Sequence, residues 1–307
     1  MASLKNIKLK ILSYKKTGTV THAMEAVSAV KMRKGQERAL AGRAYAAAGL
    51  SVLERLASSA DVAQHLLMQE GNGKTCIIIV TSDKGLAGAL NSGVIRRAEH
   101  EITRLNLVKE DVVIVAIGRR GGDFFANRGY DVRERHENVS DDVSESEIRA
   151  VTDKVIEWHA AEEIGACYII YQNFVSTFEQ QPSARQIVPI TPHMMGEMVA
   201  GIRPARGRYA PPKRERREER TPATYTIEPD ADTVLSVLLP RLLNVAIFHT
   251  VLESKASEHS ARMVAMKSAT DKAKEMAGDL TRTFNKVRQA AITREVSEIT
   301  SGIEAMR

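Results

Sequence analysis

The chain begins and ends with two long stretches in which apolar residues recur every three or four positions. The first stretch covers residues 1–60, and the second covers residues 230–307. Such spacings place side chains on one face of an α-helix, so each stretch predicts a long amphipathic helix. Neither helix can bury its apolar face alone. The two ends are therefore expected to pair with each other as one coiled-coil rod.

The apolar positions define the seam expected between the two helices, and their steps of three and four are typical of coiled coils. Gly18 is expected to loosen the first helix locally, and Pro240 is expected to kink the second near its start. The seam residues expected in the first helix are Leu4, Ile7, Ile11, Tyr14, Val20, Met24, Val27, Val30, Leu40, Ala44, Ala47, Leu50, Leu53 and Leu56. Those expected in the second are Val245, Phe248, Leu252, Ala256, His259, Met263, Met266, Ala273, Met276, Leu280, Phe284, Val287 and Ala291.

Between the helices, residues 74–200 alternate between short apolar runs and amphipathic segments. The runs at 75–81 and 112–117 are apolar on both faces, which is typical of central strands in a parallel sheet. This alternation predicts a Rossmann-like α/β domain between the two helices. The further elements expected are strands at 131–136, 167–174 and 185–190 and helices at 92–105, 121–128 and 144–163.

The amino-acid composition favours some classes of protein over others. Aromatic residues make up only 5% of the chain, which suits long packed helices better than a deep aromatic-lined pocket. The two cysteines, Cys76 and Cys167, lie in apolar strand-like runs, which favours small core residues in a reducing compartment. The N-terminus lacks the apolar core of a signal peptide, and we expect no stretch long and apolar enough to span a bilayer. Any membrane role is expected to be peripheral.

A basic segment separates the central domain from the last helix. Residues 201–224 mix arginines with prolines, which predicts an exposed, poorly ordered loop. Its positive charge, concentrated in residues 203–220, could also hold nucleic acid or anionic lipid. Tyr209 is the only aromatic residue in that stretch, so a solvated insertion is the favoured interpretation.

The candidates for catalysis are weak. Residues 81–91 follow the first central strand, where a phosphate loop would lie, but Gly85 and Gly88 fit neither common glycine-rich motif. A structural turn with Asn91 or Ser92 capping the next helix is favoured. Adjacent helical residues point in different directions, which excludes a triad of Ser257, Glu258 and His259. His22, His249 and His259 have no second ligand one turn away, and a hydrogen-bonded interior histidine is the favoured interpretation for His259. We therefore predict no catalytic residue, metal site or cofactor.

The segment from Arg288 to Glu295 differs from an ordinary solvated helix end. Small apolar residues, Ala290 and Ala291, lie among its charges and would keep the helix thin. A thin tip with a few directed charges suits insertion into a snug, mostly apolar sleeve.

Several stretches, in order along nearly the whole chain, resemble the gamma subunit, or central rotor shaft, of the F-type ATP synthase. Two departures are Thr17–His22, where the family has a more polar, helix-favouring pattern, and Ala87, where it often has cysteine. The basic loop is also longer and more positive than is usual in the family. The stretches that carry the resemblance are 23–33 (AMEAVSAVKMR), 82–91 (SDKGLAGALN), 228–230 (EPD), 257–267 (SEHSARMVAMK) and 285–293 (NKVRQAAIT).

The resemblance implies an antiparallel coiled coil of the two ends inside a hexamer of three alpha and three beta subunits. It implies that the α/β domain is the foot of the shaft, against the membrane c-ring and the epsilon subunit. Nucleotide chemistry would occur on the partner subunits, so the chain itself would be non-catalytic and need no cofactor. The expected location is peripheral, on the cytoplasmic side of a bacterial plasma membrane.

The resemblance also assigns partner-binding residues. Arg288 and Gln289 are implied as directed contacts to a beta-subunit loop. The foot would meet the c-ring or epsilon through Tyr225, Glu228 and Asp230. Further residues implied to contact the alpha and beta hexamer are Met24, Lys31, Arg33, Arg262, Thr293 and Glu295.

Two other classes of protein stay open. One is a nucleotide-handling enzyme built on the α/β domain, with the helices as dimerisation arms. The other is a basic scaffold that binds nucleic acid through residues 203–220. Binding of ATP by the isolated chain would favour the first, and salt-sensitive binding of nucleic acid would favour the second.

Overall fold

The computed structural model describes residues 4–56, 65–191, 193, 194, 196 and 230–306. The chain divides into two compact units, one of Met1–Ser28 with Arg262–Arg307 and one of Ala29–Ala261. The predicted basic loop lies outside the described residues. The elements are α1 (Leu4–Ala41), α2 (Arg43–Leu56), η2 (Leu66–Met68), β1 (Lys74–Val80), α3 (Leu90–Arg104), η3 (Lys109–Asp111), β2 (Val112–Ile117), α4 (Arg119–Asn127), β3 (Asp131–His136), α5 (Glu145–Ala160), β4 (Ile164–Ser176), β5 (Glu179–Val188) and α7 (Ala231–Glu304).

The larger unit is built on a five-stranded sheet in the order β3-β2-β1-β4-β5. β1 lies at the centre and pairs in parallel with β2 and β4, as the apolar runs predicted. β3 is a parallel edge strand with the predicted bounds. β5 pairs antiparallel with β4 in a hairpin, so it begins six residues earlier than predicted.

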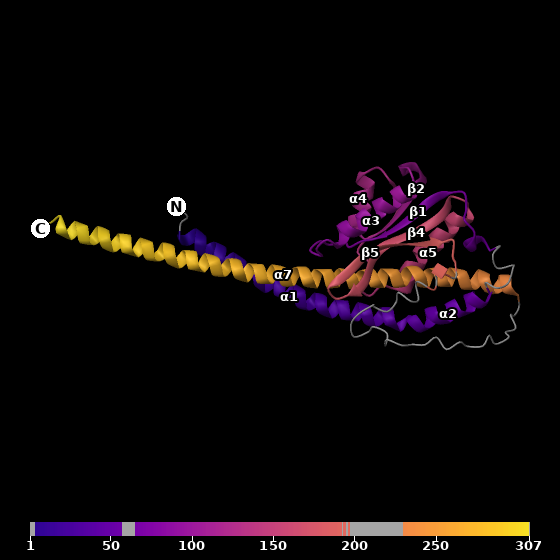
Figure 1. Ribbon diagram of the computed structural model, residues 1–307, viewed down its shortest axis with the longest axis horizontal. Helices are drawn as coiled ribbons and strands as arrows, with labels where there is room; N and C mark the ends of the chain where they lie inside the picture. The colour runs from indigo at the N-terminus through magenta and orange to yellow at the C-terminus, as the bar shows by residue number, and fades with distance from the viewer. Residues whose placement is uncertain (1–3, 57–64, 192, 195, 197–229, 307) are drawn as a thin grey trace. The chain divides into compact units, whose positions relative to one another are not determined.

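Helices cover both faces of this sheet (Figure 1). On one face, residues of α3 and α4 such as Val94 and Phe125 pack against alternate residues of β1 and β2. On the other face, α5 and the first part of α7 pack over the remaining strand residues, with Leu53 of α2 in the same core. Both cysteines are buried in the sheet, where Cys76 and Cys167 are register partners on β1 and β4.

Within the larger unit, α1 and α2 run antiparallel to α7 in a constant register. A Cβ added to Gly35 would lie 3.4 Å from Cβ of Ala256, one at Gly42 would meet His249, and one at Gly49 would meet Leu242. The partner number falls by seven each time the glycine number rises by seven, which is a heptad repeat. Glycine at these positions lets the two backbones approach closely. The N-terminal helical segment is interrupted at Gly42, where α1 ends and α2 begins. The sequence pattern did not predict this interruption.

Within the smaller unit, α1 and α7 pair through small and polar residues. Gly18 faces Ala273, and the hydroxyls of Thr21 and Thr270 hydrogen-bond at 2.6 Å. α1 is one continuous helix through Gly18. The prediction that Gly18 loosens the helix is therefore wrong for its secondary structure. The reason is that the missing side chain lets α7 pack directly against this turn.

The predicted seam is correct in part. Ile7, Leu50 and Met266 are buried, but Val20, Val27 and Val30 are exposed. α1 carries a second apolar face about opposite the buried one, and the buried face is built from residues that include Gly18, Thr21 and Ser28. In α7, Met276, Val287 and Ala291 are exposed as well.

α7 is one helix of 74 residues that Pro240 does not interrupt. It contains an 18-residue window of mean hydropathy 1.7, so our expectation that no segment could span a bilayer is wrong by length and composition alone. Of that window, 56% is buried in the structure. Packing against the sheet and the N-terminal helices accounts for its apolar character.

Candidate partner-binding surfaces

The last part of α7 is a helix without a partner among the described residues. Every residue from Asn285 to Glu304 is exposed. Ile292, Val296, Ile299 and Ile303 follow each other by four, three and four positions, so they form one apolar stripe. An apolar stripe of this length on an exposed helix is typical of a binding surface.

The four residues that the resemblance assigned to this helix lie on the same surface. Arg288, Gln289, Thr293 and Glu295 are all exposed, and none forms a hydrogen bond or ion pair with the described residues. Arg288 and Glu295 are seven residues apart and share one face, and Gln289 and Thr293 share the neighbouring one. Their side chains are available for contacts with another protein.

A second apolar stripe lies on α1 in the smaller unit. Leu9, Leu12, Val20 and Val27 recur at helical spacing, and each is at least half exposed. The groove between α1 and α7 nearby has a volume of about 820 Å³ and is bordered by Tyr14, His22 and Lys274. α1 therefore presents apolar surface on a side that faces away from its seam with α7.

The other assigned residues of the helices are engaged inside the chain. Met24 is half-buried, and Arg262 is buried with only 9% of its surface exposed. Arg33 donates to Glu37 at 3.0 Å, one turn further along α1. Lys31 pairs with Asp141 at 2.6 Å, so its charge is used within the larger unit.

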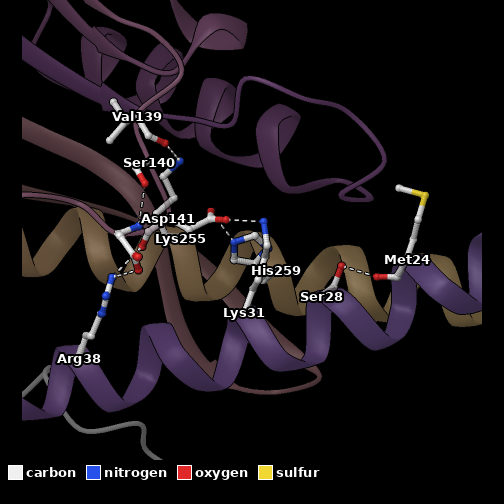
Figure 2. Close-up of polar contacts among 10 residues, drawn as sticks. Met24, Ser28, Lys31, Arg38, Val139, Ser140, Asp141, Lys255 and His259 are labelled. Carbon is white, nitrogen blue, oxygen red and sulfur yellow. Dashed lines mark hydrogen bonds and ion pairs between the residues drawn. The ribbon is translucent and has the colours of Figure 1, made fainter.

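Asp141 is the centre of a polar cluster that the sequence did not reveal (Figure 2). Lys31 of α1 donates to its Oδ2 at 2.6 Å, and His259 of α7 lies with Nε2 2.8 Å from its Oδ1. Although partial burial raises the pKa of Asp141, hydrogen bonds from Lys31 and His259 outweigh it and lower that pKa to about 2. His259 is thus the hydrogen-bonded interior histidine that the sequence predicted.

The remaining predicted histidines differ from each other. His22 is exposed on α1, so it is not an interior residue. His249 is buried against Gly42, and burial lowers its pKa despite a hydrogen bond to the backbone of Gly42. Among the described residues, no group of three or more side chains is arranged to hold a metal ion.

The loop after β1 is held by hydrogen bonds to Asn91 and to the start of α4. The backbone N–H of Ser82 donates to Asn91 Oδ1 at 2.9 Å, and that of Arg119 donates to Asp83 Oδ1 at 3.0 Å. The N–H of Gly121 donates to Thr81 Oγ1 at 2.9 Å. Arg119 and Gly121 lie at the start of α4, so the loop after β1 supplies hydrogen-bond acceptors to the first turn of that helix. Asn91 is therefore not the cap of α3, which follows Ala89 without a side-chain cap.

Of the residues assigned to the foot, only Asp230 lies in the described chain. Its carboxylate accepts hydrogen bonds from the N–H and the hydroxyl of Thr233, each at 2.8 Å, and these bonds lower its pKa. This geometry stabilises the first turn of α7. Tyr225 and Glu228 lie outside the described residues.

Comparison with known proteins gives a consistent result over the whole chain. A family model described as ATP synthase matches residues 3–306. The ATP synthase gamma chain of Pelotomaculum thermopropionicum is 37% identical over 307 residues, and that of Geotalea daltonii is 38% identical over 308 residues. Both alignments cover 100% of this chain and 100% of the relative.

Solved structures share the fold. A chain from the Euglena gracilis mitochondrial ATP synthase (OSCP/F1/c-ring, rotational state 3) is similar with a TM-score of 0.62 and 16% identity, covering 99% of this chain and 94% of that one. A chain from the central stalk and c-ring of the Tetrahymena thermophila mitochondrial enzyme is similar with a TM-score of 0.56 and 19% identity. That match covers 81% of this chain and 99% of the other.

Proposed function

This chain belongs to the ATP synthase gamma chain family, and we propose that it is the rotary central shaft of a proton-translocating ATP synthase. In this role it couples rotation of the membrane c-ring to conformational change at the catalytic beta subunits. The chain itself carries out no nucleotide chemistry. Its partners are three alpha and three beta subunits around the helices, with epsilon and the c-ring at the α/β foot.

The uncovered end of α7 is the observation that supports this proposal most strongly. A single helix of this length is marginal in water without tertiary packing, and its apolar stripe calls for a surrounding surface. Each isoleucine or valine of the stripe gains about 1.5–3 kcal/mol when it is fully buried. A sleeve formed by the alpha and beta subunits would supply that burial.

The asymmetry of the smaller unit gives the mechanism. Paired α1 and α7 have no threefold symmetry, so they offer unlike faces to three equivalent neighbours. A neighbour changes its conformational equilibrium only through such differential contacts. Each proton that crosses 100 mV releases about 2.3 kcal/mol, so forcing one nucleotide site open takes several protons and on the order of 10 kcal/mol.

The proposal also covers the location of the chain in the cell and the contacts of its α/β foot. ATP synthase is membrane-associated, and we place this chain on the cytoplasmic side of a bacterial inner membrane as a peripheral subunit. Tyr225, Glu228 and Asp230 are proposed contacts to the c-ring or epsilon. The alternative of a nucleotide-handling enzyme is disfavoured because the ATP synthase family model and the gamma chain relatives match along nearly the whole chain.

Replacing Arg288 and Gln289 together by alanine should lower ATP synthesis and coupled ATPase activity about tenfold or more, because each loses a directed polar contact to a beta subunit. Circular dichroism should show unchanged helix content, since both side chains are exposed. Lys272→Ala is the matched control, because it removes an exposed cation of the same helix that forms an ion pair with nearby Glu275. Activity equal to that of the control would remove Arg288 and Gln289 from the site.

Co-purification tests the proposed function directly. A tagged copy of this chain should isolate alpha and beta subunits in a ratio of one to three to three. Removing residues 285–307 should weaken that assembly, because it deletes the exposed stripe. A tagged chain that binds ATP alone and retains no alpha or beta subunit would support the enzyme alternative instead.

A further inference from the structure

Within the larger unit, the loop between β3 and α5 forms polar contacts with both α1 and α7 (Figure 2). To α1, Asp141 binds Lys31, and Asp142 forms an ion pair with Arg38. The guanidinium of Arg38 also donates to the carbonyl oxygen of Asp141 at 3.3 Å. The loop therefore contacts one face of α1, because positions 31 and 38 are seven residues apart.

The same loop holds α7 at two positions one turn apart. His259 contacts the Asp141 carboxylate, and Lys255 donates to the carbonyl oxygen of Val139 at 2.8 Å. The Asp141 carboxylate contacts both helices, with one oxygen for each. Its side chain is 38% exposed, which leaves the ion pairs partly shielded from solvent.

These contacts lie on either side of a position where only small side chains of α1 and α7 meet. Gly35 lies between Lys31 and Arg38, and its partner Ala256 lies between Lys255 and His259. Resistance to sliding in a helix pair comes from side chains of one helix that insert between those of the other. Glycine against alanine provides almost none of this, so polar contacts are the main source of restraint between α1 and α7 at this level.

We propose that Asp141 is a positioning residue that locks α1 and α7 in register at Gly35 and Ala256. Resting on the proposed function, this makes the β3–α5 loop one point where torque passes from the α/β domain to α1 and α7 together. Without the lock, force on the sheet would move one helix along the other. The Asp141 carboxylate is suited to this because charged hydrogen bonds are short and strong.

The test uses the assembled ATP synthase in membrane vesicles, with Asp141→Asn as the main variant. Asp153→Asn is the matched control, because it removes one carboxylate from the exposed face of α5. ATP hydrolysis, ATP-driven proton pumping and amide exchange in the isolated chain are measured together. Asp141→Asn should keep ATP hydrolysis and lose proton pumping, while amides near Lys31 and Lys255 exchange about tenfold faster than in the control.

Two further variants separate positioning from general stability. His259→Gln keeps an N–H donor for Asp141 and should pump like the unchanged protein. His259→Leu removes that donor and should keep ATP hydrolysis but lose proton pumping, so it provides the test if Asp141→Asn fails to fold.

The outcomes are distinct. Faster exchange with full pumping would overturn the role in torque, and exchange and pumping equal to those of Asp153→Asn would overturn the lock itself. If even the unchanged chain fails to assemble with alpha and beta subunits, the proposed function and the role in torque both fall. The exchange data would then still decide whether the lock exists.

Discussion

Gly118→Ala should unfold the α/β part of the chain. Gly118 has a φ of +96°, and a Cβ there would lie 2.0 Å from the carbonyl oxygen of Thr81. Rotation of a side chain cannot relieve this clash, because the obstructing atom is a backbone oxygen in the segment between β1 and α3. We expect a loss of about 4 kcal/mol or more in the free energy of unfolding.

Urea unfolding checks this through the fluorescence of Trp158, the single tryptophan, which lies in α5 of the same unit. Gly129→Ala is the matched control, since Gly129 also has a positive φ of +79° but a Cβ there would have no neighbour within 4 Å. It should cost only the backbone strain of about 1–2 kcal/mol. Equal losses in the two variants would show that the contact with Thr81 does not matter.

Glu253→Gln should stabilise the chain at neutral and alkaline pH. Glu253 lies on α7 beneath the sheet, and its Oε2 has no hydrogen-bond partner among the described residues. Burial raises its pKa from 4.5 to about 7, and the positive charge of Arg185 and the nearby Tyr171 hydroxyl offset only part of this effect. Ionised Glu253 is therefore costly inside the folded chain.

The direction of the pH dependence follows from proton binding. Between pH 4.5 and about 7 the folded chain keeps the proton that the unfolded chain has lost, so stability falls as pH rises through this range. The total effect is about 3 kcal/mol, and Glu253→Gln should remove it. His249 acts in the opposite direction, because its lowered pKa costs stability as pH falls below 6.5. The informative quantity is therefore the difference between the unchanged protein and the variant.

Urea unfolding at several pH values between 5 and 8 measures this difference. Glu179→Gln, at an exposed position of β5, is the control and should leave the pH profile unchanged. The lowered pKa of Asp141 affects stability only between its usual 3.8 and about 2, outside this range. A constant difference between Glu253→Gln and the unchanged protein from pH 5 to 8 would contradict a buried, proton-binding Glu253.

The sequence predicted the central strands β1 and β2 well because both are nearly continuous apolar runs. Val112–Ile117 is apolar throughout and is buried throughout. The helix seam was harder, since α1 has two apolar faces and only one meets α7. The hydrophobic pattern predicts Val20 and Val27 at the seam. The close approach of α1 and α7 instead requires small residues there, such as Gly18 and Thr21. The heptad spacing of Gly35, Gly42 and Gly49 was the available signal, and it was missed.

The candidate binding surfaces were also predictable from the sequence only in part. The exposed residues Arg288 and Gln289 came from a resemblance, and their contacts to beta stay a prediction. Asp141 could not be found from the sequence, because its partners Lys31 and His259 are 110 and 118 residues away. Lys31 was assigned to the hexamer for the same reason, since only the fold brings it to Asp141.

Rotation of this chain inside its complex is the central claim, and a single-molecule observation tests it most directly. Both native cysteines are buried, so Glu110→Cys at an exposed site would carry the only readily labelled thiol on this chain. With alpha and beta subunits fixed to a surface, a bead on this cysteine should turn in one direction when ATP is added. It should pause once for each beta subunit. ATP hydrolysis beside a bead that never turns would contradict the account.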